Sequence, residues 1–166
     1  MAKWTMDLNK YCKDKEVELK DIRKTYAFAL YSSIVKKTPV GNPDFDKDSG
    51  RARGNWQVTV GAPAEGEVKD RRKTPKPISS MPEPKGDESI FITNNVPYIT
   101  TLEYGGYPTP VKKGSRTRKE IKPPRYEIMS EGGYSKQAPE GMVGVTLANN
   151  KNIFDSAVRA VKGRSK

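Results

Sequence analysis

The chain has 166 residues, which suits one domain, and only 34% of them are hydrophobic, so its core can only be small. Its 31 basic and 20 acidic residues give a net charge of +11, which favours an acidic partner such as nucleic acid, an acidic protein surface or a membrane face. One cysteine and no histidine exclude a structural zinc site, an internal disulfide and a Ser–His–Asp or Cys–His catalytic arrangement.

Nothing in the sequence is expected to carry the chain into or across a membrane. No run approaches the roughly 18 consecutive apolar residues that a membrane-spanning helix needs. The N-terminal residues MAKWTMD lack the apolar centre of a signal peptide. We therefore expect no membrane partner, and a protein that is made and kept in the cytosol until it is assembled.

The first predicted element is a long helix over residues 7–37. Thr38 ends it, because Pro39 disfavours helical backbone in the residue before it. A helix of this length is about 45 Å long, so we expect its charged first half to project from the domain or to pack on a neighbour. Cys12 lies on the apolar stripe and is expected to be a small buried hydrophobe. The apolar residues that recur at steps of three and four are Leu8, Tyr11, Cys12, Leu19, Ile22, Tyr26, Ala29, Leu30 and Ile34.

Two short strands and a short helix are predicted next. Residues 39–54 are rich in Asp, Gly and Pro and are expected to be a linker. Apolar and polar residues alternate over about 55–60 and again over 89–93, which indicates two half-buried strands. Pro97 suits the first turn of a helix over residues 98–104, which the following glycines end.

Two long polar segments, at about residues 62–88 and 107–131, are predicted to be irregular loops. Their prolines and charges leave them little to bury. The last segment is predicted to be a helix from about residue 139 to 162, with Gly144 and residues 149–150 as weak points. A basic tail follows it.

Together these elements predict an α+β fold in a single domain over residues 1–166. It combines a long N-terminal helix, a small antiparallel β-sheet, a short middle helix and a C-terminal helix, with long irregular loops between them.

Four short stretches of the sequence, here called the motif stretches, are informative together because of their order along the chain. They are TPV at residues 38–40, GRARGNW at 50–56, ITNNVPYITTLEYG at 92–105 and SKQAPEGMV at 135–143. In this order they resemble the neck and tail-completion (head–tail joining) proteins of tailed bacteriophages, similar to the minor tail protein Z of lambda-like phages. The resemblance covers about two thirds of the chain, and residues 106–133 are longer than the family pattern, so we treat them as an insertion.

The resemblance implies a structural virion protein, not an enzyme, with no catalytic residue, metal or cofactor. Copies would form a homo-oligomeric ring, with a hexamer favoured over a dodecamer, in the neck of the virion. The ring would lie between the head-side connector and the tail terminator proteins, and double-stranded DNA would pass through its lumen. Such a protein is assembled in the host cytoplasm and remains in the virion.

The candidate interface residues are charged. In an extended chain Arg51 and Arg53 share a face, and we expect them to point away from the core, towards Glu103, a neighbouring subunit or DNA. The plain interpretation is that all three are solvated surface charges. The candidates for an interface or for facing DNA are Arg51, Arg53, Glu103, Lys112, Lys113, Arg116, Arg118 and Lys119. The residues expected to pack together beneath the two strands are Trp56, Pro97, Tyr98 and Leu102.

Two other functions fit parts of the sequence. A basic nucleic-acid-binding protein of ribosomal or chromatin type would use the basic insertion with Tyr107, Tyr126 and Tyr134 as stacking surfaces. Against it, the basic residues are spread along the chain and no nucleic-acid-binding motif is present. An enzyme could pair Glu103 with Asp87 or Glu88 as acid and base, but nothing in the sequence ties these carboxylates together.

Overall fold

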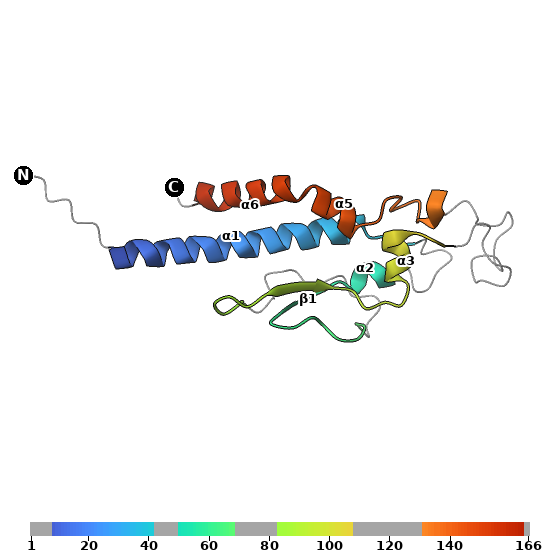
Figure 1. Ribbon diagram of the computed structural model, residues 1–166, viewed down its shortest axis with the longest axis horizontal. Helices are drawn as coiled ribbons and strands as arrows, with labels where there is room; N and C mark the ends of the chain where they lie inside the picture. Colours follow the sequence, from blue (N-terminus) through green and yellow to red (C-terminus); the bar gives the residue numbers. More distant parts are fainter. Residues whose placement is uncertain (1–7, 42–49, 69–82, 108–130, 165–166) are drawn as a thin grey trace, which may run out of the picture. The chain divides into compact units, whose positions relative to one another are not determined.

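The structure is a computed structural model that describes residues 8–41, 50–68, 83–107 and 131–164. It confirms the predicted α+β class: the long N-terminal helix, the small antiparallel sheet and the short middle helix are all present (Figure 1). In chain order the described elements are α1 (Leu8–Lys37), α2 (Arg51–Gly54), β1 (Gln57–Val60), β2 (Ile90–Thr93), α3 (Ile99–Tyr104), the 3-10 turn η3 (Glu131–Gly133), α5 (Val143–Ala148) and α6 (Asn150–Arg164).

The chain divides into two compact units. Unit 1 comprises Met1–Leu30 and Asn149–Lys166, and unit 2 comprises Tyr31–Ala148. Helix α1 therefore contributes its first part to unit 1 and its last two turns to unit 2. The single domain over residues 1–166 stays a prediction.

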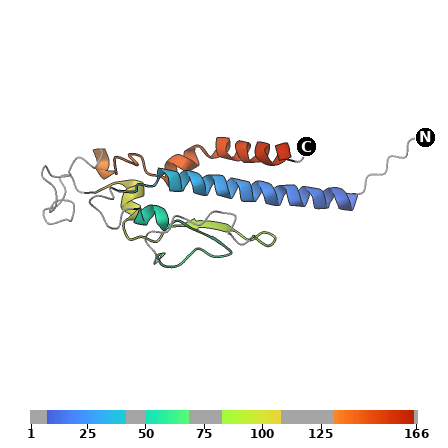
Figure 2. The same cartoon turned by 180° about the vertical axis from the view of Figure 1, so that it is seen from behind.

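In unit 1, α6 runs beside the first part of α1 in both views (Figures 1 and 2). The ring of Tyr26 meets Phe154 edge to face, with ring centroids 5.4 Å apart, and the Tyr26 hydroxyl donates a hydrogen bond to the Asn150 side chain. The pKa of Glu18 is lowered by a hydrogen bond from Lys15, and also by Lys162 near the end of α6. The two helices are therefore antiparallel.

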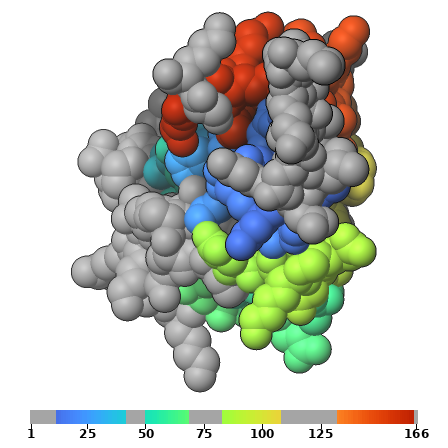
Figure 3. Space-filling view, turned by 90° about the vertical axis from the view of Figure 1, so that its left-hand side faces the viewer, coloured from blue at the N-terminus to red at the C-terminus, as the bar shows by residue number. Residues whose placement is uncertain are grey.

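Small buried side chains allow helices α1 and α6 to pack closely. Ala27, Ala157 and Val161 are each 6% exposed or less, and Figure 3 shows the red atoms of α6 next to the blue atoms of α1. Cys12 is exposed, which contradicts the prediction that it is buried. It precedes the part of α1 that α6 covers, because the end of α6 lies near Glu18.

Unit 2 holds the hydrophobic core. The last turns of α1 supply Tyr31 and Ile34, which pack with Trp56, Ala138 and Met142. Partly buried residues from both strands, α3 and α5 pack against this cluster: Val35, Val58, Ile92, Ile99, Leu102 and Val143.

The two strands pair antiparallel, with Gln57 opposite Thr93 and Val60 opposite Ile90. Val58 and Ile92 are cross-strand partners on the face that meets the core. The ladder continues by one bond beyond β1, where the Gly61 N–H donates to the Ser89 carbonyl at 2.9 Å. Among the described residues the sheet has these two strands alone, as predicted from the alternating patterns.

The linker prediction for residues 39–54 is wrong at its end, because residues 51–54 form helix α2. Gly50 has a φ of 84°, a conformation that favours glycine and lets the chain turn into this helix. Residues two apart on a helix lie about 200° apart, so Arg51 and Arg53 do not share a face as they would in an extended chain.

The predicted C-terminal helix over residues 139–162 is two helices. It breaks at Asn149, one of the predicted weak points, whereas Gly144 lies inside α5. Residues 139–142 form a turn in which Gly141 has a φ of 80°, so α5 begins only at Val143. Helix α6 continues to Arg164, two residues into the sequence predicted to be a basic tail.

The predicted loops lie partly within the described residues. Residues 62–68, 83–88 and 107 contain no helix or strand, as expected. The remainder of both loops, residues 69–82 and 108–130, lies outside the described residues, as do residues 165–166 of the tail.

The core prediction is right for two residues and wrong for two. Trp56 is 7% exposed, and Leu102 packs against the core. Pro97 is exposed and Tyr98 is 38% exposed, because Val96, only 2% exposed, enters the interior in their place.

Replacing Trp56 by alanine should lower the free energy of unfolding by about 3–5 kcal/mol, because it empties a large site in a small core. Leu147→Ala is the matched control: Leu147 is 53% exposed, and its loss should change stability by about 0.5 kcal/mol or less. Denaturant unfolding measures both. A Trp56→Ala variant as stable as the control would contradict the core assignment.

Stability should fall at alkaline pH because of Tyr31. Burial raises the pKa of Tyr31 to about 12, from 10.0 in an unperturbed tyrosine. Below pH 10 both states keep the proton and the full stability is present; between about pH 10 and 12 the unfolded chain ionises first, so the free energy of unfolding falls. Tyr31→Phe should remove this part of the decline, whereas Tyr104→Phe, at a side chain 75% exposed, should keep it.

Candidate functional site

Thr38, the first residue of the motif stretches, lies at the C-terminus of α1 with none of its surface exposed. Its hydroxyl donates to the Ile34 carbonyl at 2.8 Å and accepts a hydrogen bond from the Trp56 indole Nε1 at 2.7 Å. The buried indole N–H thereby obtains the partner that burial requires. This one side chain fixes the motif tryptophan to the end of the long helix.

Arg53 also binds the C-terminus of α1. Its Nε and Nη2 donate to the Thr38 carbonyl at 2.9 Å and 2.6 Å, and Nη2 reaches the Lys36 carbonyl at 3.3 Å. The last carbonyls of a helix lack partners inside the helix and carry partial negative charge, so a guanidinium there is favourable. Arg53 therefore does not bind Glu103, whereas its expected place at a neighbouring subunit or DNA stays a prediction.

Glu103 binds the N-terminus of α5. Its Oε2 accepts the backbone N–H groups of Met142 and Val143, each at 2.9 Å, and its Oε1 accepts that of Gly144 at 2.7 Å. These N–H groups have no partner within the helix, and the carboxylate meets the positive end of its dipole. The expected partnership of Glu103 with Arg51 or Arg53 is contradicted, because both carboxylate oxygens serve α5.

Gly141 lets the carboxylate of Glu103 come this close. A Cβ at Gly141 would lie 2.4 Å from the Glu103 carbonyl oxygen and 3.2 Å from its carboxylate carbon, and φ is 80° there. Any side chain at this position would therefore displace α3 from α5. Gly141 and Glu103, which belong to two different motif stretches, therefore form one contact.

Two further hydrogen bonds join the motif stretches. Asn94 Nδ2 donates to the Ala52 carbonyl at 2.7 Å, and the Val40 N–H donates to Gln137 Oε1 at 2.9 Å. All four motif stretches are thereby bonded to one another within unit 2. Residues far apart in the sequence meet through polar side chains that bind backbone groups, as Val40 and Gln137 do at a separation of 97.

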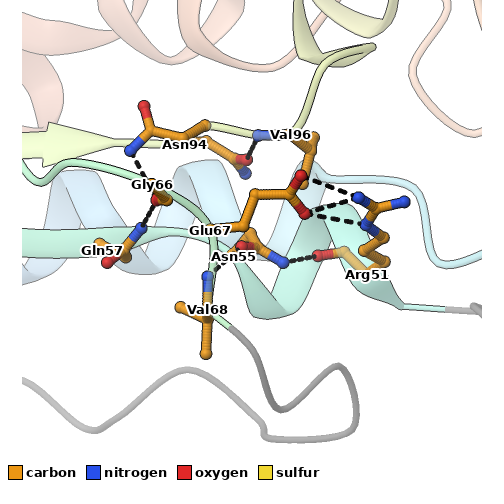
Figure 4. Close-up of polar contacts among 9 residues, drawn as sticks. Arg51, Asn55, Gln57, Gly66, Glu67, Val68, Asn94 and Val96 are labelled. Atoms are coloured by element: carbon orange, nitrogen blue, oxygen red, sulfur yellow. Dashed lines mark hydrogen bonds and ion pairs between the residues drawn. The ribbon is translucent and has the colours of Figure 1, made fainter.

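A second polar cluster joins residues before β1 and after β2 to the segment that follows β1. Three amide side chains, Asn55, Gln57 and Asn95, are here called the cradle, and they bind residues 62–68, here called the strap. Figure 4 shows Asn55 and Gln57 with the strap residues Gly66 and Val68. Gln57 Nε2 donates to the Gly66 carbonyl at 2.9 Å. Asn95 Nδ2 donates to the carbonyls of Ala64 and Gly66, both at 2.8 Å.

Asn55 fastens the end of the strap. It is 1% exposed; its Oδ1 accepts the Val68 N–H at 2.7 Å, and its Nδ2 donates to the Arg51 carbonyl at 2.8 Å. A buried amide needs partners for both ends, and here it finds them in the strap and in α2.

Arg51 completes the cluster by an ion pair with the strap. Its Nη2 lies 2.6 Å from Glu67 Oε2 and 2.8 Å from Oε1, and its Nε lies 3.0 Å from Oε2 (Figure 4). The guanidinium also lies over the ring of Tyr98, 5.8 Å from the centroid. Arg51 therefore pairs with Glu67, and its expected pairing with Glu103 is wrong. Tyr98 packs against this ion pair at the surface instead of entering the core.

The sequence interpretation missed the residues of the cradle and Glu67. The sequence pointed to two of them, because Asn55 and Asn95 belong to motif stretches. Glu67 lies in a segment without any apolar or motif pattern, so nothing in the sequence singled it out. The remaining candidates, Lys112, Lys113, Arg116, Arg118 and Lys119, lie outside the described residues.

The part of the chain that the structure describes contains no group of three or more acidic or cysteine side chains placed to hold a metal ion. In the same residues no helix is both long and apolar enough to cross a membrane. A scan against protein-family models gave no match, and comparisons with curated proteins and with solved structures gave no significant one.

Replacing Glu103 by glutamine should destabilise the protein by about 1–3 kcal/mol, because a charged acceptor of three backbone N–H groups is lost. The amide nitrogen of the glutamine would also face these backbone N–H groups, and two hydrogen-bond donors cannot bind each other. Glu140→Gln, at an exposed residue of the adjacent turn, is the matched control and should change stability by about 0.5 kcal/mol or less. Equal thermal melting of the two variants would remove Glu103 from the support of α5.

Proposed function

We propose that this protein is a structural component of the neck of a tailed phage virion, which forms a ring that joins the DNA-filled head to the tail and lets DNA pass. The observation that carries the proposal is the convergence of the four motif stretches. They were recognised only by their order in the sequence, and each is bonded to another of them in unit 2. Residues that fix one another's positions in this way are expected to be kept together in proteins of the same fold, which supports the resemblance to the neck proteins.

The small sheet also supports assembly. All residues of β1 and β2 are only half-buried, and the sheet has two strands among the described residues. Two strands are marginal without further packing, and a homo-oligomer supplies that packing at the same site on every copy. In a phage neck, the chain would therefore be one subunit of a ring of identical copies.

Backbone hydrogen bonds join the two described ends of the basic insertion. The Gly106 N–H donates to the Gly132 carbonyl at 2.7 Å, and the Tyr107 N–H to the Gly133 carbonyl at 3.3 Å. The two described ends of the insertion therefore lie side by side in unit 2. The lysines and arginines of the insertion suit phosphate groups or acidic neighbours, as a ring around DNA requires.

A phage that lacks this protein should accumulate DNA-filled heads and finished tails that do not join. Purified protein added to a mixture of the two should restore infectious particles, and electron microscopy should show a ring at the junction. A variant with glutamine at Lys112, Lys113, Arg116, Arg118 and Lys119 should melt normally and join poorly, because the charge that meets DNA or acidic neighbours is removed.

The matched control replaces five exposed lysines elsewhere by glutamine and should join normally: Lys13, Lys36, Lys85, Lys136 and Lys151. Heads and tails that join without the protein would overturn the proposal. Binding of duplex DNA with a steep salt dependence, together with normal joining in its absence, would favour the alternative of a basic nucleic-acid-binding protein.

A further inference from the structure

The hairpin of β1 and β2 has two outer edges, and its register shows which main-chain groups lie on them. In an antiparallel pair, residues that bind the opposite strand through N–H and C=O alternate with residues whose N–H and C=O point outward. The Gly61 N–H donates to the Ser89 carbonyl at 2.9 Å, so this pair is of the first kind. The strand residues of the second kind, here called the edge residues, are Val58, Val60, Ile90 and Ile92.

The outward groups of the edge residues are unpaired in the part of the chain that the structure describes. No hydrogen bond from a described residue outside the two strands reaches their main-chain N–H or C=O groups. The strap does not pair with either edge, because it is bound by side chains such as those of Gln57 and Thr59. All residues of β1 and β2 remain partly exposed. Both edges can therefore pair with a further strand.

Neither edge carries the features by which proteins prevent such pairing. Exposed edges are usually protected by charged side chains, by proline or by a bulge. Residues 56–62 and 89–96 contain no charged residue and no proline. The register of the two strands is continuous, without a bulge. An unprotected edge of this kind suits a chain whose strands are paired in an assembly.

The side chains of the edge residues favour a second copy as the source of the further strand. The cross-strand partners are Val58 with Ile92 and Val60 with Ile90, so all four share one face of the sheet. Val58 and Ile92 pack against the core, which makes this the apolar face. If β1 of a second copy lies beside β2, its two valines come next to the two isoleucines, and the apolar face continues across the junction. Pairs of β-branched residues on neighbouring strands stabilise a sheet, and both strands have four residues, so the two edges match in length.

We propose that β2 of each copy pairs with β1 of the next, so that the hairpins of all copies join into one antiparallel sheet around the ring. The contact uses a different edge of each copy, and contacts of this kind can close into rings. It also gives each two-stranded sheet the further strands that it needs for stability. The inference deepens the proposed function, on which it rests for the closure of the ring, by naming the surface through which copies associate.

Proline at an edge residue tests each edge separately. Proline has no N–H, and at these positions it removes a donor that the ladder within the chain does not use. Val60→Pro should block the edge of β1 and Ile90→Pro the edge of β2, and each variant alone should associate about tenfold or more weakly than the wild type. Both residues lie at strand ends and outside the group that packs on the core, so both variants should remain folded, which circular dichroism checks.

Alanine at the same positions is the matched control. Val60→Ala and Ile90→Ala shorten the side chain but keep the main-chain N–H, so each should associate more tightly than the proline variant at its position. Proline variants that associate as the wild type does would overturn the proposal.

A mixture of the two proline variants distinguishes this contact from a symmetric one. The Val60→Pro chain keeps its β2 edge and the Ile90→Pro chain keeps its β1 edge, so an equal mixture should form one-to-one pairs and nothing larger. Sedimentation equilibrium with a mass label on one variant measures this composition. A symmetric contact of β2 with β2 would overturn the proposal: Ile90→Pro alone would then abolish association, and Val60→Pro would leave it unchanged.

Hydrogen exchange on the wild-type chain tests the proposal without any substitution. The N–H groups of the edge residues should exchange rapidly in dilute solution and slowly at about 1 mM, where copies associate. Exchange that stays rapid at both concentrations, or a chain that is monomeric at the higher one, contradicts the sheet contact. If heads and tails still need the protein in order to join, that result removes the sheet contact and leaves the proposed function standing.

Discussion

The end of α1 at Thr38 is the constraint on which unit 2 depends. A long helix stops there inside the protein, so its last carbonyl groups must find partners away from water. Thr38, with none of its surface exposed, binds back to Ile34 and holds the Trp56 indole, while Arg53 covers the terminal carbonyls. The tryptophan at the centre of the small core is thus oriented by a polar contact with a helix end.

The same solution recurs at the beginning of α5, where Glu103 receives three backbone N–H groups. In both places a charged side chain of a motif stretch compensates a helix terminus of opposite partial charge. A chain with 34% hydrophobic residues has few apolar contacts with which to place its helices. Bonds from polar side chains to backbone groups supply the positions, which explains why these motif residues are polar yet contribute to the fold.

The strap follows a different principle, since it is fastened at the surface. The buried amide of Asn55 belongs to the fixed part of unit 2, whereas the strap residues that it meets are largely exposed. Each of the hydrogen bonds and the ion pair of the strap contributes only about 1 kcal/mol net, so the strap is held by the sum of many small contributions.

The sequence by itself determined the elements whose signals are local. The helical period from Leu8 onwards, the stop before Pro39 and the alternating patterns at about 55–60 and 89–93 all rest on neighbouring residues. The structure contains each element, with the strands at 57–60 and 90–93. Helix α2 was missed because the turn at Gly50 and the Asn55 side chain establish it, and Cys12 was misplaced because burial depends on where α6 ends. Only the tertiary structure decided what the charges do: Arg51 pairs with Glu67, Arg53 with a helix C-terminus and Glu103 with a helix N-terminus. The sequence does not distinguish a charged side chain that contacts water from one that binds a carboxylate or a helix end. Which of these it contacts depends on segments that are distant along the chain.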